Sequence, residues 1–202
     1  MGNLEIEVKF FVPDIRSLRQ DILDLGARSR GKFFEQNIRL EDPNKTLRSK
    51  KCLLRLRHDH KTTLTFKSKP TEDSRQFKVF NELEVEISDF ATMRAILESL
   101  GFHCEQVYEK WRETLVLENT YFCLDTMPYG KFLEIEGSRK DIRQYARGLG
   151  LQWDKRILTN YLQIFEILKE KLDLKFNDVT FENFKDIDVE FQNFVHLIEA
   201  GG

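Results

Sequence analysis

Apolar and charged residues alternate along several short segments of the chain. Residues 4–10 place Leu, Ile, Val and Phe on one face of an extended strand, and Glu5, Glu7 and Lys9 on the other. Successive side chains of a β-strand point to opposite faces, so this period of two predicts a strand with one apolar and one charged face. The same alternation predicts strands at residues 54–57, 63–67, 82–87, 110–112 and 132–136.

The charged faces carry doublets of one sign. Glutamates alternate at positions 5 and 7, at 82, 84 and 86, and at 134 and 136, and arginines alternate at 55 and 57. A solvated face would also be polar, but it normally mixes residue types, whereas like charges at this spacing repel each other. Carboxylate doublets favour a hard divalent cation such as Mg²⁺ or Mn²⁺, and basic doublets favour a polyphosphate. A metal–triphosphate complex would satisfy both.

For the charged faces to converge on one ligand, the sheet has to close on itself. We therefore predict an α+β fold, in which helices pack outside a closed antiparallel β-barrel with a charged lumen. Helix caps at Asp14, Asp89 and Ser138 each stand twelve positions before a glycine, and apolar residues lie at matching offsets between them. Strands at 35–41 and 112–118 follow the first two of these helices. The recurrence suggests an internal duplication, although helical periodicity alone would produce a similar likeness.

The last third of the chain predicts a helix and an aromatic tail. Residues 151–172 carry an apolar stripe and are expected to form one helix. The tail contains five phenylalanines among acidic and amide residues, and we expect it to dock on the outside of the barrel or to cover one end. A homodimer contact is the alternative. We accordingly divide the chain into a barrel domain, 1–172, and a Phe-rich extension, 173–202.

Composition narrows the choice of partners. With 202 residues, 41% hydrophobic and 33% charged, the chain is expected to be a globular protein with one core. A net charge of −2 gives no electrostatic reason to bind nucleic acid or an anionic membrane. The N-terminal residues show no export signal, so we expect a cytoplasmic protein. The three cysteines and four histidines lack the spacing of a disulfide framework or a metal site.

A series of motifs then occurs in a fixed order. It begins with Glu5-Ile6-Glu7-Val8-Lys9, which is similar to an ExExK signature. It continues with Gln36-Asn37, Leu54-Arg55-Leu56-Arg57, Leu64-Thr65-Phe66-Lys67, Glu82-Leu83-Glu84-Val85, Tyr108-Glu109-Lys110-Trp111-Arg112, Leu124-Asp125 and Gly130-Lys131-Phe132-Leu133-Glu134-Ile135-Glu136-Gly137. Over residues 1–168 the series resembles the CYTH superfamily of triphosphate tunnel metalloenzymes, which includes class IV adenylate cyclases, thiamine triphosphatases and tripolyphosphatases.

The resemblance implies an eight-stranded tunnel and assigns roles to its residues. The divalent metal, Mg²⁺ or Mn²⁺, would be held by Glu5, Glu7, Glu134 and Glu136, with help from Glu84 and Asp125. The triphosphate would be bound by Lys9, Arg55, Arg57, Lys67, Lys110 and Arg112. Glu7, Lys9 and Arg112 are the candidate catalytic residues. From the pattern alone, Asp125 could equally be a turn residue.

Two reactions fit these residues. In a triphosphatase, water attacks the terminal phosphorus. In an adenylate cyclase, the 3′-hydroxyl of ATP attacks the α-phosphorus, so that cyclic AMP and pyrophosphate form. Hydrolysis is favoured because it needs only the tunnel, whereas cyclisation also needs a purine pocket that the sequence does not locate. A non-catalytic polyphosphate- or nucleotide-binding module is the third hypothesis, and the many carboxylates opposite the basic residues disfavour it.

Overall fold

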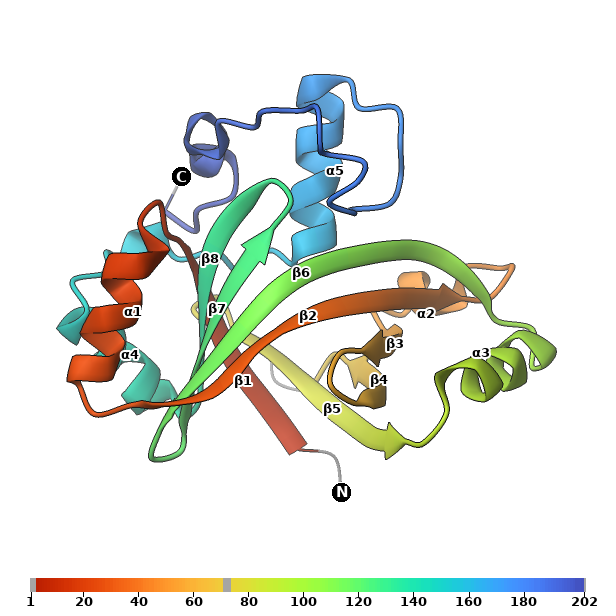
Figure 1. The fold of residues 1–202 in the computed structure, drawn as a ribbon, viewed down its shortest axis with the longest axis horizontal. Helices are drawn as coiled ribbons and strands as arrows, with labels where there is room; N and C mark the ends of the chain where they lie inside the picture. The colour runs from red at the N-terminus through yellow and green to blue at the C-terminus, as the bar shows by residue number, and fades with distance from the viewer. Residues whose placement is uncertain (1–2, 71–73, 202) are drawn as a thin grey trace.

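The computed structural model describes residues 3–70 and 74–201, and its strands form a closed antiparallel barrel (Figure 1). The strands are β1 (Asn3–Phe11), β2 (Arg28–Glu41), β3 (Leu53–His58), β4 (Thr62–Ser68), β5 (Lys78–Ile87), β6 (His103–Leu117), β7 (Thr120–Met127) and β8 (Gly130–Glu136). Around the barrel their order is β1-β5-β4-β3-β2-β6-β7-β8. The predicted fold class is confirmed. The expectation that the chain has no export signal rests partly on Met1 and Gly2, which lie outside the described residues.

Five α-helices accompany the strands in the described ranges. They are α1 (Ile15–Asp24), α2 (Thr46–Ser49), α3 (Phe90–Ser99), α4 (Arg139–Gly148) and α5 (Tyr161–Leu172). The three predicted caps are confirmed, because the side chains of Asp14, Asp89 and Ser138 each accept a backbone N–H hydrogen bond from the first turn of α1, α3 and α4. None of the described helices is long and apolar enough to cross a membrane.

The apolar faces of the strands point outward, and helices cover them on two sides of the barrel. On one side, Val8 and Leu133 of the barrel pack in one buried cluster with Ile22 of α1 and Ile142 of α4. On another side, Leu56 of β3 packs in a second cluster with residues of α3 (Figure 1). Helices therefore cover part of the outer surface, whereas Leu83 and Val85 of β5 stay exposed there, and the alternate, charged positions of the strands line the lumen.

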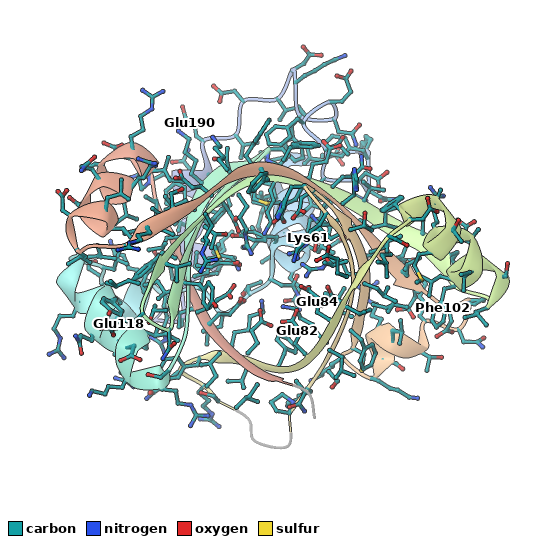
Figure 2. The ribbon with its side chains drawn as sticks, turned by 60° about the horizontal axis from the view of Figure 1, so that its bottom comes forward. Lys61, Glu82, Glu84, Phe102, Glu118 and Glu190 are labelled. Atoms are coloured by element: carbon teal, nitrogen blue, oxygen red, sulfur yellow. The ribbon has the colours of Figure 1, made fainter. Side chains whose placement is uncertain are left out.

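One end of the barrel is covered by α5 and the tail. Phe132 of β8 lies in a buried cluster with Phe165 of α5 and with Phe184 and Phe191 of the tail. The tail also pairs with β6, because Val179 N donates to Val107 O at 2.8 Å and Glu109 N donates to Val179 O at 2.9 Å. In the view through the open end, α5 lies behind the lumen (Figure 2). The barrel therefore has one open mouth, at the opposite end.

The expected helix over residues 151–172 is wrong in its first part. A 3₁₀ turn, Trp153–Lys155, is followed by extended chain, and α5 begins only at Tyr161. The backbone of Ile157 is used elsewhere, since it donates to Lys9 O at 2.7 Å and accepts from Lys9 N at 3.2 Å. Asn160 then starts the helix in a capping box with Gln163. The segment before α5 is therefore held against the end of the lumen.

Candidate functional site

Three glutamates form an acidic cluster in the lumen. Glu5 and Glu7 come from the lumen face of β1, and Glu136 of β8 stands opposite Glu7 in the strand register. One carboxylate oxygen from each lies within 4.8 Å of the others. Burial and the negative charges of Glu7 and Glu5 raise the pKa of Glu136 to about 8, although Arg112 opposes the shift. The surroundings therefore do not stabilise a negative charge on all three carboxyl groups at once.

Ammonium groups already lie against this acidic cluster. Lys67 Nζ donates to Glu5 Oε1 at 2.7 Å, and Lys78 of β5 is hydrogen-bonded to Glu7. Burial opposes the charge of Lys78, but the attraction of Glu7 prevails and raises its pKa. Carboxylate oxygens this close together are the donors that a hard divalent cation prefers, so Glu5, Glu7 and Glu136 fit such an ion.

The other three predicted metal ligands lie in ion pairs with basic residues. Glu134 Oε1 is 3.0 Å from Lys9 Nζ, and Glu134 also accepts from Arg112. Asp125 is fully buried and accepts from Arg112 Nε at 2.6 Å. Glu84 of β5 accepts from Thr65 Oγ1 at 2.7 Å. The structure thus gathers three of the six predicted acids in one cluster and places the rest beside the predicted phosphate-binding groups.

The predicted basic residues all face the lumen, in three places. Lys9, Lys110 and Arg112 surround Asp125 and Glu134, and Lys110 Nζ donates to Asp125 Oδ2 at 3.1 Å. Burial lowers the pKa of Lys9 despite the attraction of Glu134.

Arg55 and Arg57 of β3 form the second group. Their guanidinium nitrogens lie 3.7 Å and 3.4 Å from the carboxylate oxygens of Glu84. Lys67 lies apart from both groups, next to Glu5 and 3.2 Å from Glu82 Oε2. Glu82 and Glu84 both stand at the open mouth (Figure 2).

Several buried polar atoms on this basic side lack hydrogen-bond partners among the described residues. They are both amide atoms of Asn37, Nε of Arg55 and of Arg57, Oγ1 of Thr63 and Oε2 of Glu35. The register aligns Asn37 with Arg57, and Arg57 with Thr63, on three adjacent strands. Since buried polar groups are nearly always hydrogen-bonded, this row fits a bound polar ligand that carries many oxygen atoms.

Glu35, Lys78 and Tyr161 belong to the site but were missed by the sequence analysis. Burial alone would raise the pKa of Glu35, yet the positive charges of Lys110, Arg112 and Arg57 lower it to about 2. Glu35 shares its strand face with Asn37 and Arg39, and the apolar residues Ile38 and Leu40 on the other face could have assigned Glu35 to the lumen; Gln36 weakens that signal.

Tyr161 lies at the closed end of the lumen. Its hydroxyl donates to Asp125 Oδ2 at 2.7 Å, and its ring centroid lies 4.1 Å from Lys9 Nζ. It is the first residue of α5, which no strand pattern could connect to the barrel.

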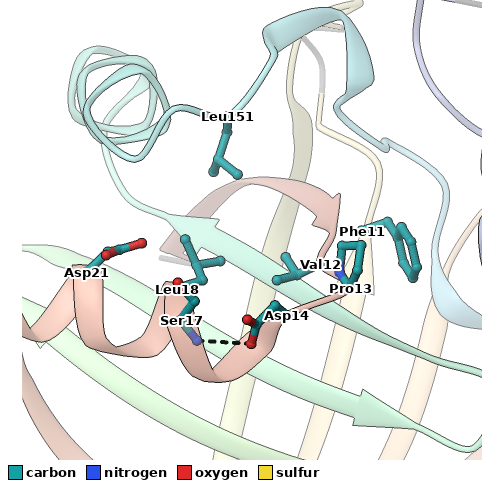
Figure 3. Close-up of a pocket in the computed structure, with 8 residues that line it drawn as sticks. All are labelled: Phe11, Val12, Pro13, Asp14, Ser17, Leu18, Asp21 and Leu151. Carbon is teal, nitrogen blue, oxygen red and sulfur yellow. Dashed lines mark hydrogen bonds between the residues drawn. The ribbon is translucent and has the colours of Figure 1, made fainter.

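A separate pocket lies outside the barrel, between the end of β1 and α1 (Figure 3). It encloses about 350 Å³ and is lined by Phe11, Val12, Pro13, Asp14, Ser17, Leu18, Asp21 and Leu151. Asp14 is engaged as the cap of α1, where it accepts from Ser17 N at 3.1 Å. Because this pocket has no basic side chain, the lumen is the better candidate for a site that binds an anion.

Comparison with known proteins agrees with this geometry. The CYTH domain model matches residues 3–157, which is more than half of the chain. The chain therefore belongs to the CYTH family, and its barrel is the fold of that family.

Three relatives illustrate the likeness. "Putative adenylate cyclase MJ0240" of Methanocaldococcus jannaschii is 28% identical over 173 residues, which are 80% of this chain and 98% of that protein. The structure of the PH1012 protein from Pyrococcus horikoshii OT3 is 31% identical, with a TM-score of 0.66, and the match covers 78% of this chain and 96% of that one. HpAC1 from Hippeastrum, an adenylyl cyclase by name with a dominant triphosphatase activity, matches at 18% identity with a TM-score of 0.61, over 83% and 96% of the two chains. That last likeness shows the fold alone.

Proposed function

We propose that the protein is a divalent-metal-dependent triphosphatase that binds its substrate in the lumen. The observation that supports this most is the arrangement of charge. The acidic cluster of Glu5, Glu7 and Glu136 shares the lumen with Arg55 and Arg57, whose buried Nε atoms have no hydrogen-bond partner among the described residues. A triphosphate needs cationic donors along its chain and a metal on its oxygens, and this lumen offers donors for both.

The substrate would lie with its phosphates along the basic residues. Arg55 and Arg57 present planar guanidinium groups, which suit paired phosphate oxygens, and Lys110 and Lys67 supply further positive charge. The amide of Asn37 adds a neutral donor in the same row as Arg57. Binding in a site closed at one end fixes the direction of the chain and excludes bulk water from the deep phosphates.

Arg112 and Lys9 stand where the basic and acidic sides meet. Both contact Glu134, two residues before Glu136 on β8. In this position they can stabilise the negative charge that grows on the phosphate oxygens as the P–O bond breaks. A Mg²⁺ or Mn²⁺ ion bound by the acidic cluster would add Lewis-acid stabilisation of that charge.

Hydrolysis then requires an oriented water molecule. A carboxylate of the cluster, with Glu7 as the candidate, accepts a hydrogen bond from the water molecule. The water oxygen then attacks the terminal phosphorus. The new bond joins the water oxygen to that phosphorus, the bond to the bridging oxygen breaks, and the released proton passes to the carboxylate. Orthophosphate leaves with the diphosphate product.

Cyclisation of ATP is the second candidate, because relatives carry adenylate cyclase names. The same residues would hold the triphosphate, but the 3′-hydroxyl would attack the α-phosphorus. Hydrolysis ranks first because the arrangement of the lumen residues serves it without any further group.

The test is product analysis. The protein is incubated with Mg²⁺ or Mn²⁺ and either tripolyphosphate or ATP, and orthophosphate, pyrophosphate and cyclic AMP are resolved. We expect metal-dependent orthophosphate release. Cyclic AMP with stoichiometric pyrophosphate would replace hydrolysis by cyclisation, and no turnover of either compound would leave a binding module. An Arg112→Ala variant controls for contaminating phosphatases, because only activity of the lumen falls with it.

A further inference from the structure

An aromatic pair lies beside the phosphate-binding residues and outside the apolar core. Phe33 of β2 stands opposite Arg112 in the register of β2 and β6, so its ring shares the lumen face with that guanidinium. The ring stacks on His60, with 4.1 Å between ring centroids and 28° between planes. Neither ring belongs to the three apolar clusters of the described residues.

The pair stands at the open mouth. His60 lies in the turn between β3 and β4, next to Lys61, which is seen at the opening in Figure 2. The side chain of His60 is 49% exposed. An exposed ring stacked on a lumen-facing phenylalanine offers a flat aromatic surface at the edge of a lumen lined mainly by polar and charged side chains.

The flat surface is tied to the triphosphate site by Asp59. His60 Nδ1 lies 3.0 Å from Asp59 Oδ1, and the other oxygen of Asp59 lies 3.6 Å from Arg57 Nε. On the other side, the chain makes room for the Phe33 ring at Gly31. A Cβ at Gly31 would stand 2.8 Å from Phe33 Cε2, and the φ of Gly31 is +107°. Asp59 therefore links His60 to Arg57, and Phe33 joins that link by stacking on His60.

We propose that the Phe33–His60 pair is a stacking site for the planar base of a nucleoside triphosphate whose phosphates occupy the lumen. This rests on the proposed function and narrows its substrate class from any triphosphate to one that carries an aromatic heterocycle. Stacking on an aromatic side chain strengthens the binding of any nucleobase, because every base has a π-face. Tripolyphosphate lacks such a ring and gains nothing from the pair.

The test compares two ligands that are not hydrolysed. Dissociation constants are measured by calorimetry in Mg²⁺ for the β,γ-methylene analogue of ATP and for the bis-methylene analogue of tripolyphosphate. The quantity compared is the dissociation constant of the ATP analogue divided by that of the tripolyphosphate analogue. In Phe33→Leu we expect this ratio to rise at least about fivefold, since stacking of one base is worth this factor or more. His60→Ala should raise the same ratio. Because His60 lies in an exposed turn, this variant is expected to fold even if Phe33→Leu does not.

The matched control is Phe34→Leu. Phe34 is the next residue on β2 but faces outward, where its ring contacts Trp111 and Phe181, and it should leave the ratio unchanged. An unchanged ratio in both Phe33→Leu and His60→Ala would overturn the stacking site. The ratio does not depend on turnover, so a wild-type protein that hydrolyses nothing yet shows the expected ratios would refute the triphosphatase and keep the stacking site.

Discussion

Metal binding by the acidic cluster should depend steeply on pH. Burial, together with Glu7 and Glu5, raises the pKa of Glu136 to about 8, so at neutral pH this carboxyl carries a proton when no metal is bound. A cation has to displace that proton before it can use the carboxylate. Raising the pH toward 8 should therefore strengthen metal binding, and a further rise should change it little.

The size of the effect follows from the pKa. For one displaced proton and a pKa of about 8, the apparent affinity grows roughly fiftyfold between pH 6 and pH 8, and less than about twofold between pH 8 and pH 9. The stability of the metal-free fold changes with pH in the opposite direction. A carboxyl whose folded pKa lies above its unfolded value is most favourable when protonated, so the stability that it contributes is lost as the pH rises through 8.

The assay is Mn²⁺ titration followed by electron paramagnetic resonance at pH 6, 7, 8 and 9. Glu136→Gln is the control, because it keeps the shape of the side chain and removes the carboxyl group that titrates. It should bind Mn²⁺ more weakly than the wild type at pH 8 and with a much flatter pH profile. A wild-type affinity that does not change between pH 6 and pH 8, or an equal slope in the variant, would refute the reasoning.

Three further predictions test other parts of the site and the residues that support it. Glu7→Gln should abolish metal-dependent turnover while the circular dichroism spectrum stays native, since the amide oxygen can still accept from Lys78; full activity would contradict the role of Glu7. Tyr161→Phe removes a buried hydrogen bond to Asp125 and should lower the free energy of unfolding by about 1.5–3 kcal/mol in urea titrations, whereas an unchanged midpoint would mean that the bond is not formed. Asn160→Ala removes the capping box of α5 and should cost about 1 kcal/mol in the same assay, with Gln163→Ala as a partner variant that loses the other half of the box.

Most of the barrel could be predicted because charge alternates with apolar residues along its strands. In β1, Glu5, Glu7 and Lys9 face the lumen while Val8 lies under helices, so the period of two is visible in the sequence. β7 carries no such signal. Its lumen face includes Cys123 as well as Asp125, and both of its faces are mostly buried, so charged and apolar residues do not alternate along it.

The rest of the site depends on long-range contacts. Tyr161 reaches Asp125 only because the chain after α4 returns across the end of the barrel, where Ile157 pairs with Lys9. No local periodicity encodes that return, so the apolar stripe predicts a helix from residue 151, ten residues before α5 begins. Lys78 is similar, since its partner Glu7 lies on a strand distant in sequence.

The central claim is that the lumen binds metal and triphosphate together. The most direct measurement is calorimetric binding of the bis-methylene analogue of tripolyphosphate, with and without Mg²⁺, in the wild type and in Glu7→Gln. In the wild type, Mg²⁺ should strengthen binding at least about tenfold, because the metal relieves repulsion between the glutamates and the ligand. In Glu7→Gln that enhancement should be largely lost. Equal affinity with and without Mg²⁺ in the wild type, or the same enhancement in both proteins, would contradict a shared metal and triphosphate site.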